Sequence, residues 1–176
     1  MTTTGVSAAD IIATSAAVIA LLAMGATFWQ AAIARKHNKL SVRPLLTRSQ
    51  YRNFGPEGTS YRIGVVNVGV GPALITDRYF EENGTRLSFP TGEHPVQSVL
   101  RAALASKIEY KVLRYGLPAV QGGIAPQTEL TVFELLFPTL TERTAPILDE
   151  FAKRYALVVE YESLYGEKRT LRVVAE

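Results

Sequence analysis

The chain has 176 residues, with 19 basic and 16 acidic side chains and a formal net charge of +3. It contains no cysteine, which excludes disulfide bonds, thiol catalysis and cysteine-bound zinc. Residues 41–176 hold sixteen basic and fifteen acidic side chains, so this part of the chain is nearly neutral. Nucleic acid is not an expected partner, because its binding needs a clustered basic surface.

Residues 11–34 carry no ionisable side chain, and a basic stretch follows them directly. A helix needs about 20 apolar residues to cross the hydrocarbon core of a bilayer. We therefore expect residues 1–40 to form a short tail, a single transmembrane helix and a basic flank. Residues 41–176 are enough for one folded domain with a substantial core. The lipid bilayer is the first expected partner.

The charges that flank the apolar segment predict its orientation. No Lys or Arg precedes the segment, whereas Arg35, Lys36 and Lys39 follow it. Because basic residues beside a span stay in the cytoplasm, we expect the N-terminus outside and the folded domain in the cytoplasm. Phe28 and Trp29 lie one to two turns before the basic residues, where aromatic rings settle at the headgroups.

A cleaved secretory signal is the alternative to an anchor. Residues 32–34, Ala-Ile-Ala, resemble a cleavage site at the end of an apolar run. Secretory signals, however, begin with a basic region and have a shorter apolar core. The only charge before this segment is that of Asp10, so an uncleaved anchor is favoured.

Small side chains recur along one face of the apolar segment, at alternating spacings of four and three residues. The stripe includes Ala13, Ala16, Ala20, Ala23 and Thr27. Helices in lipid associate through close van der Waals contact, which small residues allow. The pattern predicts a homo-oligomer held together by the span, with a passive single helix as the alternative.

The rest of the chain alternates in twos between apolar and polar residues, as half-buried antiparallel strands do. Asn83 and Gly84 suit a type I′ turn, because both tolerate positive φ. Residues 165–167 are expected to close the last hairpin. The expected strands are residues 45–52, 61–68, 73–80, 85–89, 110–114, 129–137, 155–162 and 168–174.

Two helices are expected within the domain, at residues 95–107 and 145–154, the second capped by Thr144. In each, the apolar residues recur on a single face, as in a helix that covers a core. The fold class is therefore mainly β: an immunoglobulin-like antiparallel β-sandwich with two inserted helices, or alternatively a small β-barrel. The inward residues are Val96, Val99, Leu100, Ala103 and Leu104 in the first helix, and Ile147, Leu148 and Phe151 in the second.

Three segments carry a resemblance to a class of proteins: the basic junction 37–44, the glycine-containing segment 67–73 and the hairpin 161–166. With the single N-terminal span, they resemble small uncharacterised bacterial single-pass inner-membrane proteins with a C-terminal β-sandwich domain. The resemblance implies an anchored sandwich and no catalytic residue. A looser likeness is to membrane-tethered β-barrel effectors of bacterial antiphage signalling, which typically have more than one span.

The segment with Asn67, Gly69, Gly71 and Pro72 is the most distinctive local motif. A glycine-rich turn can bind phosphate when backbone N–H groups converge at the start of a helix. Leu74, however, occupies the third glycine position of a dinucleotide fingerprint, and no P-loop lysine follows. We expect a structural turn in which Asn67 and the glycines adopt conformations closed to bulky residues.

Candidate catalytic groups are few. His37 flanks the span, and His94 precedes a helix, which it is expected to cap. No metal or cofactor is expected, and the protein is not expected to be an enzyme, because no nucleophile motif accompanies these groups. The carboxylates that could act in pairs, but are expected to be solvated, are Glu81 with Glu82, Asp149 with Glu150, and Glu160 with Glu162.

Three functional hypotheses follow. The first is a membrane-anchored binding or assembly module whose domain recruits an unidentified protein partner. The second is a ligand-sensing membrane effector that clusters through its span, and the third is a membrane-surface enzyme. The second hypothesis predicts a pocket lined by residues such as Arg48, Tyr51, Arg62, Arg78 and Tyr79.

Overall fold

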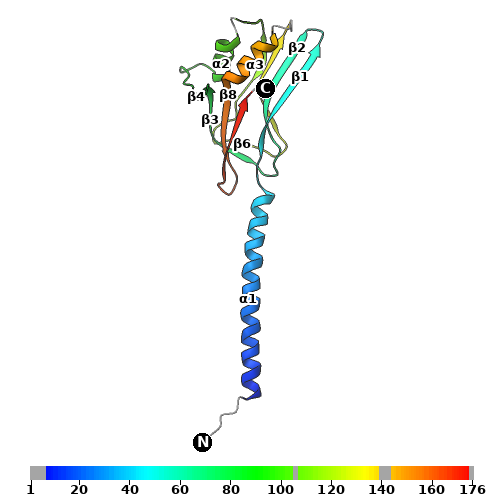
Figure 1. Cartoon of the computed structure of the whole chain (residues 1–176), viewed down its shortest axis with the longest axis vertical. Coiled ribbons are helices and arrows are strands. Elements are labelled where there is room, and N and C mark those ends of the chain that lie inside the picture. The colour runs from blue at the N-terminus through cyan, green and yellow to red at the C-terminus, as the bar shows by residue number, and fades with distance from the viewer. Residues whose placement is uncertain (1–6, 105–106, 139–143, 175–176) are drawn as a thin grey trace. The chain divides into compact units, whose positions relative to one another are not determined.

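The computed structural model describes residues 7–104, 107–138 and 144–174, apart from the side chains of residues 144, 145 and 174 (Figure 1). The chain divides into two units, Met1–Ser41 and Val42–Glu176. In the first unit, α1 (Ala8–Ser41) is long and apolar enough to cross a membrane, with a mean hydropathy of 2.1 and no buried residue. It is the only such helix among the described residues.

The start of α1 is defined by a reciprocal cap. The Ser7 hydroxyl accepts a hydrogen bond from the Asp10 backbone N–H at 3.2 Å, and the Asp10 carboxylate accepts one from the Ser7 N–H at 3.1 Å. Such a capping box satisfies donors that a helix N-terminus leaves unpaired. The apolar helix therefore begins at a defined polar boundary just before Ile11.

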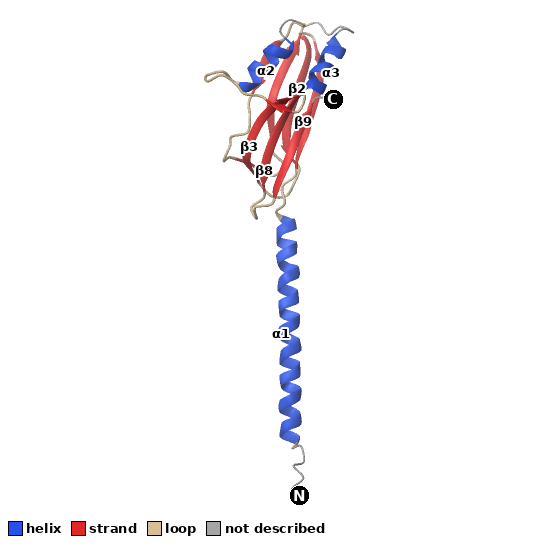
Figure 2. Ribbon diagram, turned by 60° about the vertical axis from the view of Figure 1, so that its left-hand side comes forward, coloured by secondary structure: helices blue, strands red, loops and turns tan. Residues whose placement is uncertain are grey.

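The second unit, which we call the two-sheet domain, contains two antiparallel sheets (Figure 2). The first has the order β1 (Leu46–Gly55), β2 (Gly58–Asn67), β7 (Glu129–Phe137), β5 (Lys111–Tyr115). The second has the order β4 (Thr85–Arg86), β3 (Ala73–Glu82), β8 (Tyr155–Glu162), β9 (Lys168–Val174), and β6 (Gly123–Ile124) also pairs with β3. In the described part of the chain the sheets do not close into a barrel, so the barrel alternative is wrong.

The strand boundaries confirm most of the sequence prediction. The strands expected at 129–137, 155–162 and 168–174 form with those bounds, and Asn83 and Gly84 have the two positive φ values, 50° and 82°. The first two strands are longer than expected, because they continue to a tight turn at Pro56 and Glu57. The strand expected at 85–89 shortens to two residues, since Leu87 and Phe89 pack against the core instead.

Both expected helices are present. α2 (Pro95–Leu104) buries the five apolar residues predicted for its inner face, and residues 105–106 lie outside the description. α3 (Thr144–Arg154) buries Leu148 and Phe151, and Ile147 packs against the same core. The predicted cap by the Thr144 side chain lies outside the described side chains.

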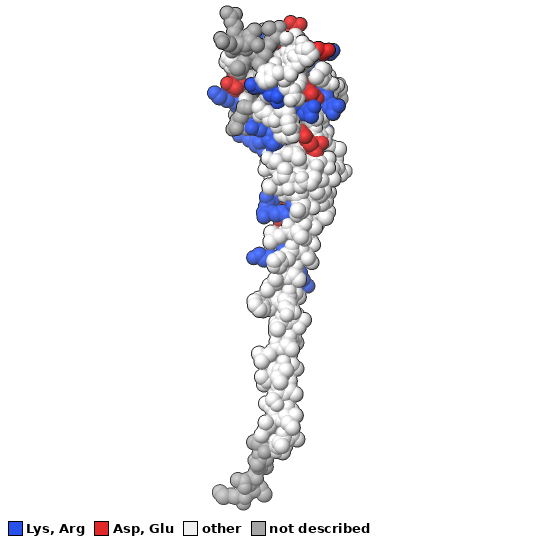
Figure 3. Space-filling model, turned by 90° about the vertical axis from the view of Figure 1, so that its right-hand side faces the viewer, with Lys and Arg blue, Asp and Glu red and all other residues white. Residues whose placement is uncertain are grey.

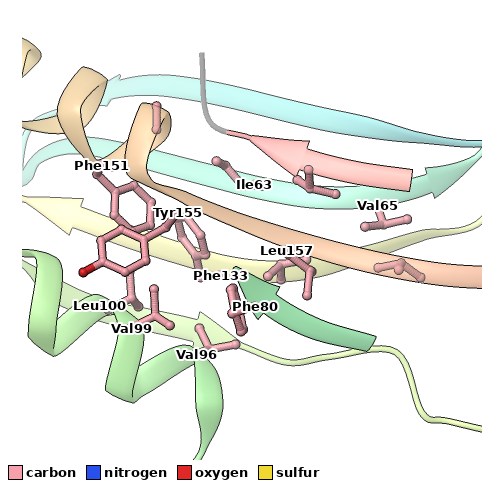
Figure 4. Packing of buried hydrophobic residues seen from close by; sticks show 14 of the residues in the cluster. Ile63, Val65, Phe80, Val96, Val99, Leu100, Phe133, Phe151, Tyr155 and Leu157 are labelled. Atoms are coloured by element: carbon pink, nitrogen blue, oxygen red, sulfur yellow. The ribbon is translucent and has the colours of Figure 1, made fainter. Parts of the chain in front are cut away.

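The core lies between the two sheets and the two helices (Figure 4). Phe133 of β7, Phe151 of α3 and Tyr155 of β8 form a chain of ring contacts at 6.0 and 5.6 Å between centroids. Each fully buried side chain of this size contributes about 1.5–3 kcal/mol by leaving water. The aromatic contacts therefore join both sheets to α3 in one core.

The last hairpin has the predicted facing pairs. Leu157 lies opposite Val173, and Val159 lies opposite Leu171, with all but Leu171 buried. Ser163, which the sequence did not single out, closes the turn: its hydroxyl accepts hydrogen bonds from the N–H groups of residues 165 and 167, each at 3.2 Å. This short polar network fixes the loop between β8 and β9.

Candidate functional site

β1 is an edge strand that pairs, among the described strands, with β2 alone. Their register runs without a shift from Leu46 opposite Asn67 to Gly55 opposite Gly58. In a two-residue hairpin of this register, alternate residues turn their backbone N–H and C=O groups away from the neighbouring strand. The outward groups of Arg52 and Phe54 have no partner within the described residues.

The side chains along the outer half of β1 are basic and aromatic. Phe54 is 76% exposed and Tyr51 is 47% exposed. The Arg62 guanidinium lies 5.8 Å from the Tyr51 ring and also donates to the Glu134 carboxylate at 3.2 Å. β1 itself contains two arginines and no acidic residue. This edge therefore combines unpaired backbone groups with positive charge and an exposed ring.

The other described edges are shorter or irregular. β4 has two residues, β5 has five with a register shift between Val112 and Arg114, and β9 has seven. Short and bulged edges are common ways of preventing a sheet from pairing with another chain. β1 has ten residues and no bulge, but the outward N–H of Leu46 donates to the Tyr161 hydroxyl at 3.3 Å. Its exposed outer half, residues 51–55, is therefore the part of the described edges best able to accept an added strand.

The five residues predicted to line a ligand pocket do not come together. They divide between the two sheets of the domain. Arg48, Tyr51 and Arg62 lie on β1 and β2, whereas Arg78 and Tyr79 lie on β3. The prediction of a single pocket lined by all five residues is therefore wrong.

A small pocket of about 190 Å³ does lie beside Arg78 and Tyr79. Its charged groups already have partners: the Arg78 guanidinium donates to the Pro118 carbonyl, and Arg86 donates to the Asp77 carboxylate at 3.0 Å. The Arg86 guanidinium also lies 4.2 Å from the Tyr79 ring. The lining residues are Arg78, Tyr79, Phe80, Arg86, Leu87, Phe89, Pro95 and Leu117.

His94 occupies the N-cap position of α2, as expected, and its carbonyl accepts a hydrogen bond from the Ser98 N–H at 3.1 Å, but its side chain packs elsewhere. Its ring packs edge-on against Tyr115, at 4.6 Å between centroids, and its buried Nδ1 has no hydrogen-bond partner among the described residues. Burial, and then the positive charge of Arg78, hold the pKa of His94 below its ordinary value of 6.5. The ring is therefore held neutral, in a packing role.

Four of the six carboxylates considered as possible acid–base pairs contact neighbouring side chains. The hydrogen bond from Lys107 lowers the pKa of Glu150. Contacts of this exposed kind contribute little to stability, about 0–1 kcal/mol each. The contacts are Glu81 with Arg172 at 3.1 Å, Glu82 with Arg154 at 2.6 Å, Glu150 with Lys107 at 2.8 Å and Glu160 with the Tyr79 hydroxyl at 3.4 Å.

Asn67 joins three segments at the end of the domain where Val42 begins. Its side chain is fully buried, and its amide donates to the carbonyls of Gly71 at 2.8 Å and Ile124 at 3.0 Å. Its Oδ1 accepts from the N–H groups of Gly69 at 3.0 Å and Leu45 at 3.2 Å. All four hydrogen-bonding positions of this amide side chain are therefore used.

Glycine is required at positions 69 and 71 because a side chain would have no space there. Neither residue has a positive φ, so the special backbone conformation expected from the sequence is not the reason. A Cβ on Gly71 would lie 1.7 Å from the Val42 carbonyl oxygen, and one on Gly69 would lie 2.3 Å from the Leu45 nitrogen. The backbone N–H of Val70 donates to the Arg43 carbonyl at 3.2 Å. The donors that a phosphate would need are thus used to hold the first residues of the domain.

The residues predicted to act in the membrane all lie on α1. Phe28 and Trp29 are each 70% exposed, and Arg35, Lys36 and Lys39 occupy the last turns of the helix. Thr27, at the end of the small-residue stripe, donates its hydroxyl to the Ala23 carbonyl at 2.8 Å. Self-association through Ala13, Ala16, Ala20, Ala23 and Thr27 stays a prediction.

Comparison with protein-family models gives no match, and comparison with curated proteins gives none either. The function of the chain therefore has to be inferred from the geometry of its own surfaces.

Proposed function

We propose that this protein is a membrane-anchored binding module whose two-sheet domain recruits a protein partner at the edge of β1. The proposed scaffold is an immunoglobulin-like sandwich, tethered by α1 in the bacterial inner membrane with the domain in the cytoplasm. The observation that carries the proposal is the unbulged, exposed outer half of β1, with its outward backbone groups at Arg52 and Phe54. An extended segment can add to such an edge through main-chain hydrogen bonds.

The side chains around this edge favour an acidic, extended partner segment. The exposed half of β1 carries Arg52 but no carboxylate, so a segment with Asp or Glu would complement it. A surface hollow of about 270 Å³ lies beside Phe54, lined also by Pro56 and Leu136. An apolar side chain of the partner would fill this hollow and fix the register of the added strand.

The membrane anchor would strengthen partner binding at this edge. Holding the domain at a membrane raises the local concentration of the binding edge, and a second copy joined through the small-residue stripe of α1 would give two linked edges. Such a module needs no catalytic group, and the role proposed for this protein is binding and not catalysis.

The proposal is tested by two matched substitutions in the full-length chain purified from its native membranes. Arg52→Pro removes an outward N–H that β2 does not use, which an edge strand tolerates. Arg52→Gln keeps this N–H and removes only the charge. We expect Arg52→Pro to abolish co-purification of the partner, and Arg52→Gln to weaken it in a salt-dependent way. Equal recovery with Arg52→Pro and the unchanged chain would contradict strand addition.

The pocket beside Arg78 favours a second candidate, a ligand-sensing membrane effector. Its two guanidinium groups, which in this structure donate to the Pro118 carbonyl and the Asp77 carboxylate, are of the kind that binds small anions. Equilibrium dialysis of the full-length protein with inorganic phosphate and with ATP tests this candidate. Binding that Arg78→Gln removes, together with ligand-dependent oligomerisation, would favour the effector over the binding module.

A further inference from the structure

We propose that the loops at the Val42 end of the two-sheet domain rest on the bilayer, with their apolar side chains among the lipid headgroups. This inference depends on the proposed membrane anchor. Of the ten large apolar side chains that are exposed in the described part of the domain, five lie in the loops at this end. These five are Leu45, Val68, Val70, Leu164 and Tyr165, which we call the apolar rim.

The strand order explains why the rim residues lie together. β1 starts, β2 ends and β3 starts at this end, so the loops 42–45 and 68–72 are neighbours. β8 passes to β9 here as well, which adds the loop 163–167 (Figure 1). Three loops that are distant in the sequence therefore present apolar side chains on one rim.

Buried polar contacts hold these side chains outward. Asn67 ties the loop 68–72 to Leu45 and to Ile124, and Ser163 fixes the turn that carries Leu164. Val70 is 62% exposed and Leu164 is 57% exposed, although neighbouring backbone N–H groups are hydrogen-bonded. Exposed apolar side chains that gather at one end of a domain mark a site of protein or membrane interaction.

The short link between α1 and the domain favours lipid as the binding partner of the apolar rim. Val42 follows α1 directly, and only residues 35–41 separate it from the apolar part of that helix. Seven helical residues rise about 10 Å, a few ångströms more than the roughly 5–8 Å of polar headgroup layer on one side of a bilayer. The rim is thus covalently held near the bilayer surface, where a soluble partner has little room to bind.

The charge distribution agrees with this assignment. On the face seen in Figure 3, the charged side chains of the domain gather toward the end away from Val42, and the part nearer Val42 is mostly uncharged. At the rim itself, Arg43 lies 4.0 Å from Glu167, so that these two charges compensate each other. A rim of this kind binds through apolar burial, with the basic residues that follow the span adding attraction to anionic lipid.

Because the chain lacks cysteine, single-cysteine labelling can test the proposal without background. Val68→Cys, Val70→Cys and Leu164→Cys place an environment-sensitive nitrobenzoxadiazole label on the rim of the full-length protein. Glu57→Cys is the matched control at the far end of β1, about 30 Å along the strand, and Ala20→Cys reports on the span. Each protein is reconstituted in vesicles of equimolar phosphatidylcholine and phosphatidylglycerol, with and without a lipid bearing a nitroxide on its headgroup.

We expect the three rim labels to emit at shorter wavelength than the Glu57 label and to lose most of their fluorescence to the nitroxide lipid. The proposal is overturned if the rim labels match the Glu57 label while the Ala20 label shows an apolar environment. If the Ala20 label is itself in water, the span is not inserted and the proposed anchor fails together with the rim. The two failures are therefore distinguishable.

Discussion

Replacing Asn67 with alanine is expected to destabilise the two-sheet domain severely. The substitution removes four hydrogen bonds, of which those to the Gly71 and Ile124 carbonyls are buried and those from Leu45 and Gly69 are half-buried. Leaving a buried polar group unpaired costs about 1–3 kcal/mol, so the two buried bonds alone account for about 2–6 kcal/mol. Against a typical total of 5–15 kcal/mol, this is a large fraction of the stability of a domain.

The assay is thermal unfolding of the full-length protein in detergent micelles, followed by near-ultraviolet circular dichroism of the tyrosines. The single tryptophan, Trp29, lies in α1, so the tyrosine signal reports on the domain. We expect Asn67→Ala to lower the midpoint by roughly 10 °C or more, given a few degrees per kcal/mol for a domain of this size. Asn53→Ala, an exposed change on β1, should shift it little. Equal midpoints for the two variants would refute the role assigned to Asn67.

Three further predictions concern packing, pH and assembly. Gly71→Ala should lower the free energy of unfolding by more than about 2 kcal/mol, because the added Cβ would overlap the Val42 carbonyl. Gly123→Ala is the control: its added Cβ meets only ordinary contacts at 3.7 Å, so this variant should unfold in urea like the unchanged chain. The unfolded chain protonates His94 at a higher pH than the folded domain does, so the free energy of unfolding should fall as the pH drops below 6.5. His94→Phe should make the free energy of unfolding, measured by urea titration at a series of pH values, less dependent on pH. If the variant shows the same change with pH as the unchanged chain, this role of His94 is contradicted. Replacing Ala16 and Ala20 with leucine should convert a detergent-solubilised oligomer to monomers in light scattering, whereas monomers before the change would refute self-association.

The sequence predicted the strands, helices and turns whose residue pattern lies within a single element. The alternation of β7 and β9 and the apolar face of α2 are each visible within one element, so their bounds or buried residues could be predicted. The turn at Asn83 and Gly84 depends on two neighbouring backbones and was predicted for the same reason. β6 was missed because two residues at the edge of β3 carry no periodic signal.

The arrangement of the surface depends on contacts between distant segments, which the sequence does not display. Asn67 was recognised as a turn residue, but its bond to Ile124 spans 57 positions and has no local signature. Arg62 and Arg78 were placed in one pocket from composition alone, although the strand order puts them on different sheets. The edge position of β1 likewise follows from the pairing of β2 with β7, which only the fold determines.

The most direct test of the proposed recruitment is site-specific photo-crosslinking from β1 in native membranes. A benzoylphenylalanine placed at Phe54 of the full-length chain should give one discrete adduct on irradiation, and Arg52→Pro in the same chain should remove it. The same group at Leu113, on the opposite edge strand β5, serves as the control, since that residue is also exposed. Adducts from Leu113 alone, or an adduct from Phe54 that survives Arg52→Pro, would contradict strand addition at β1.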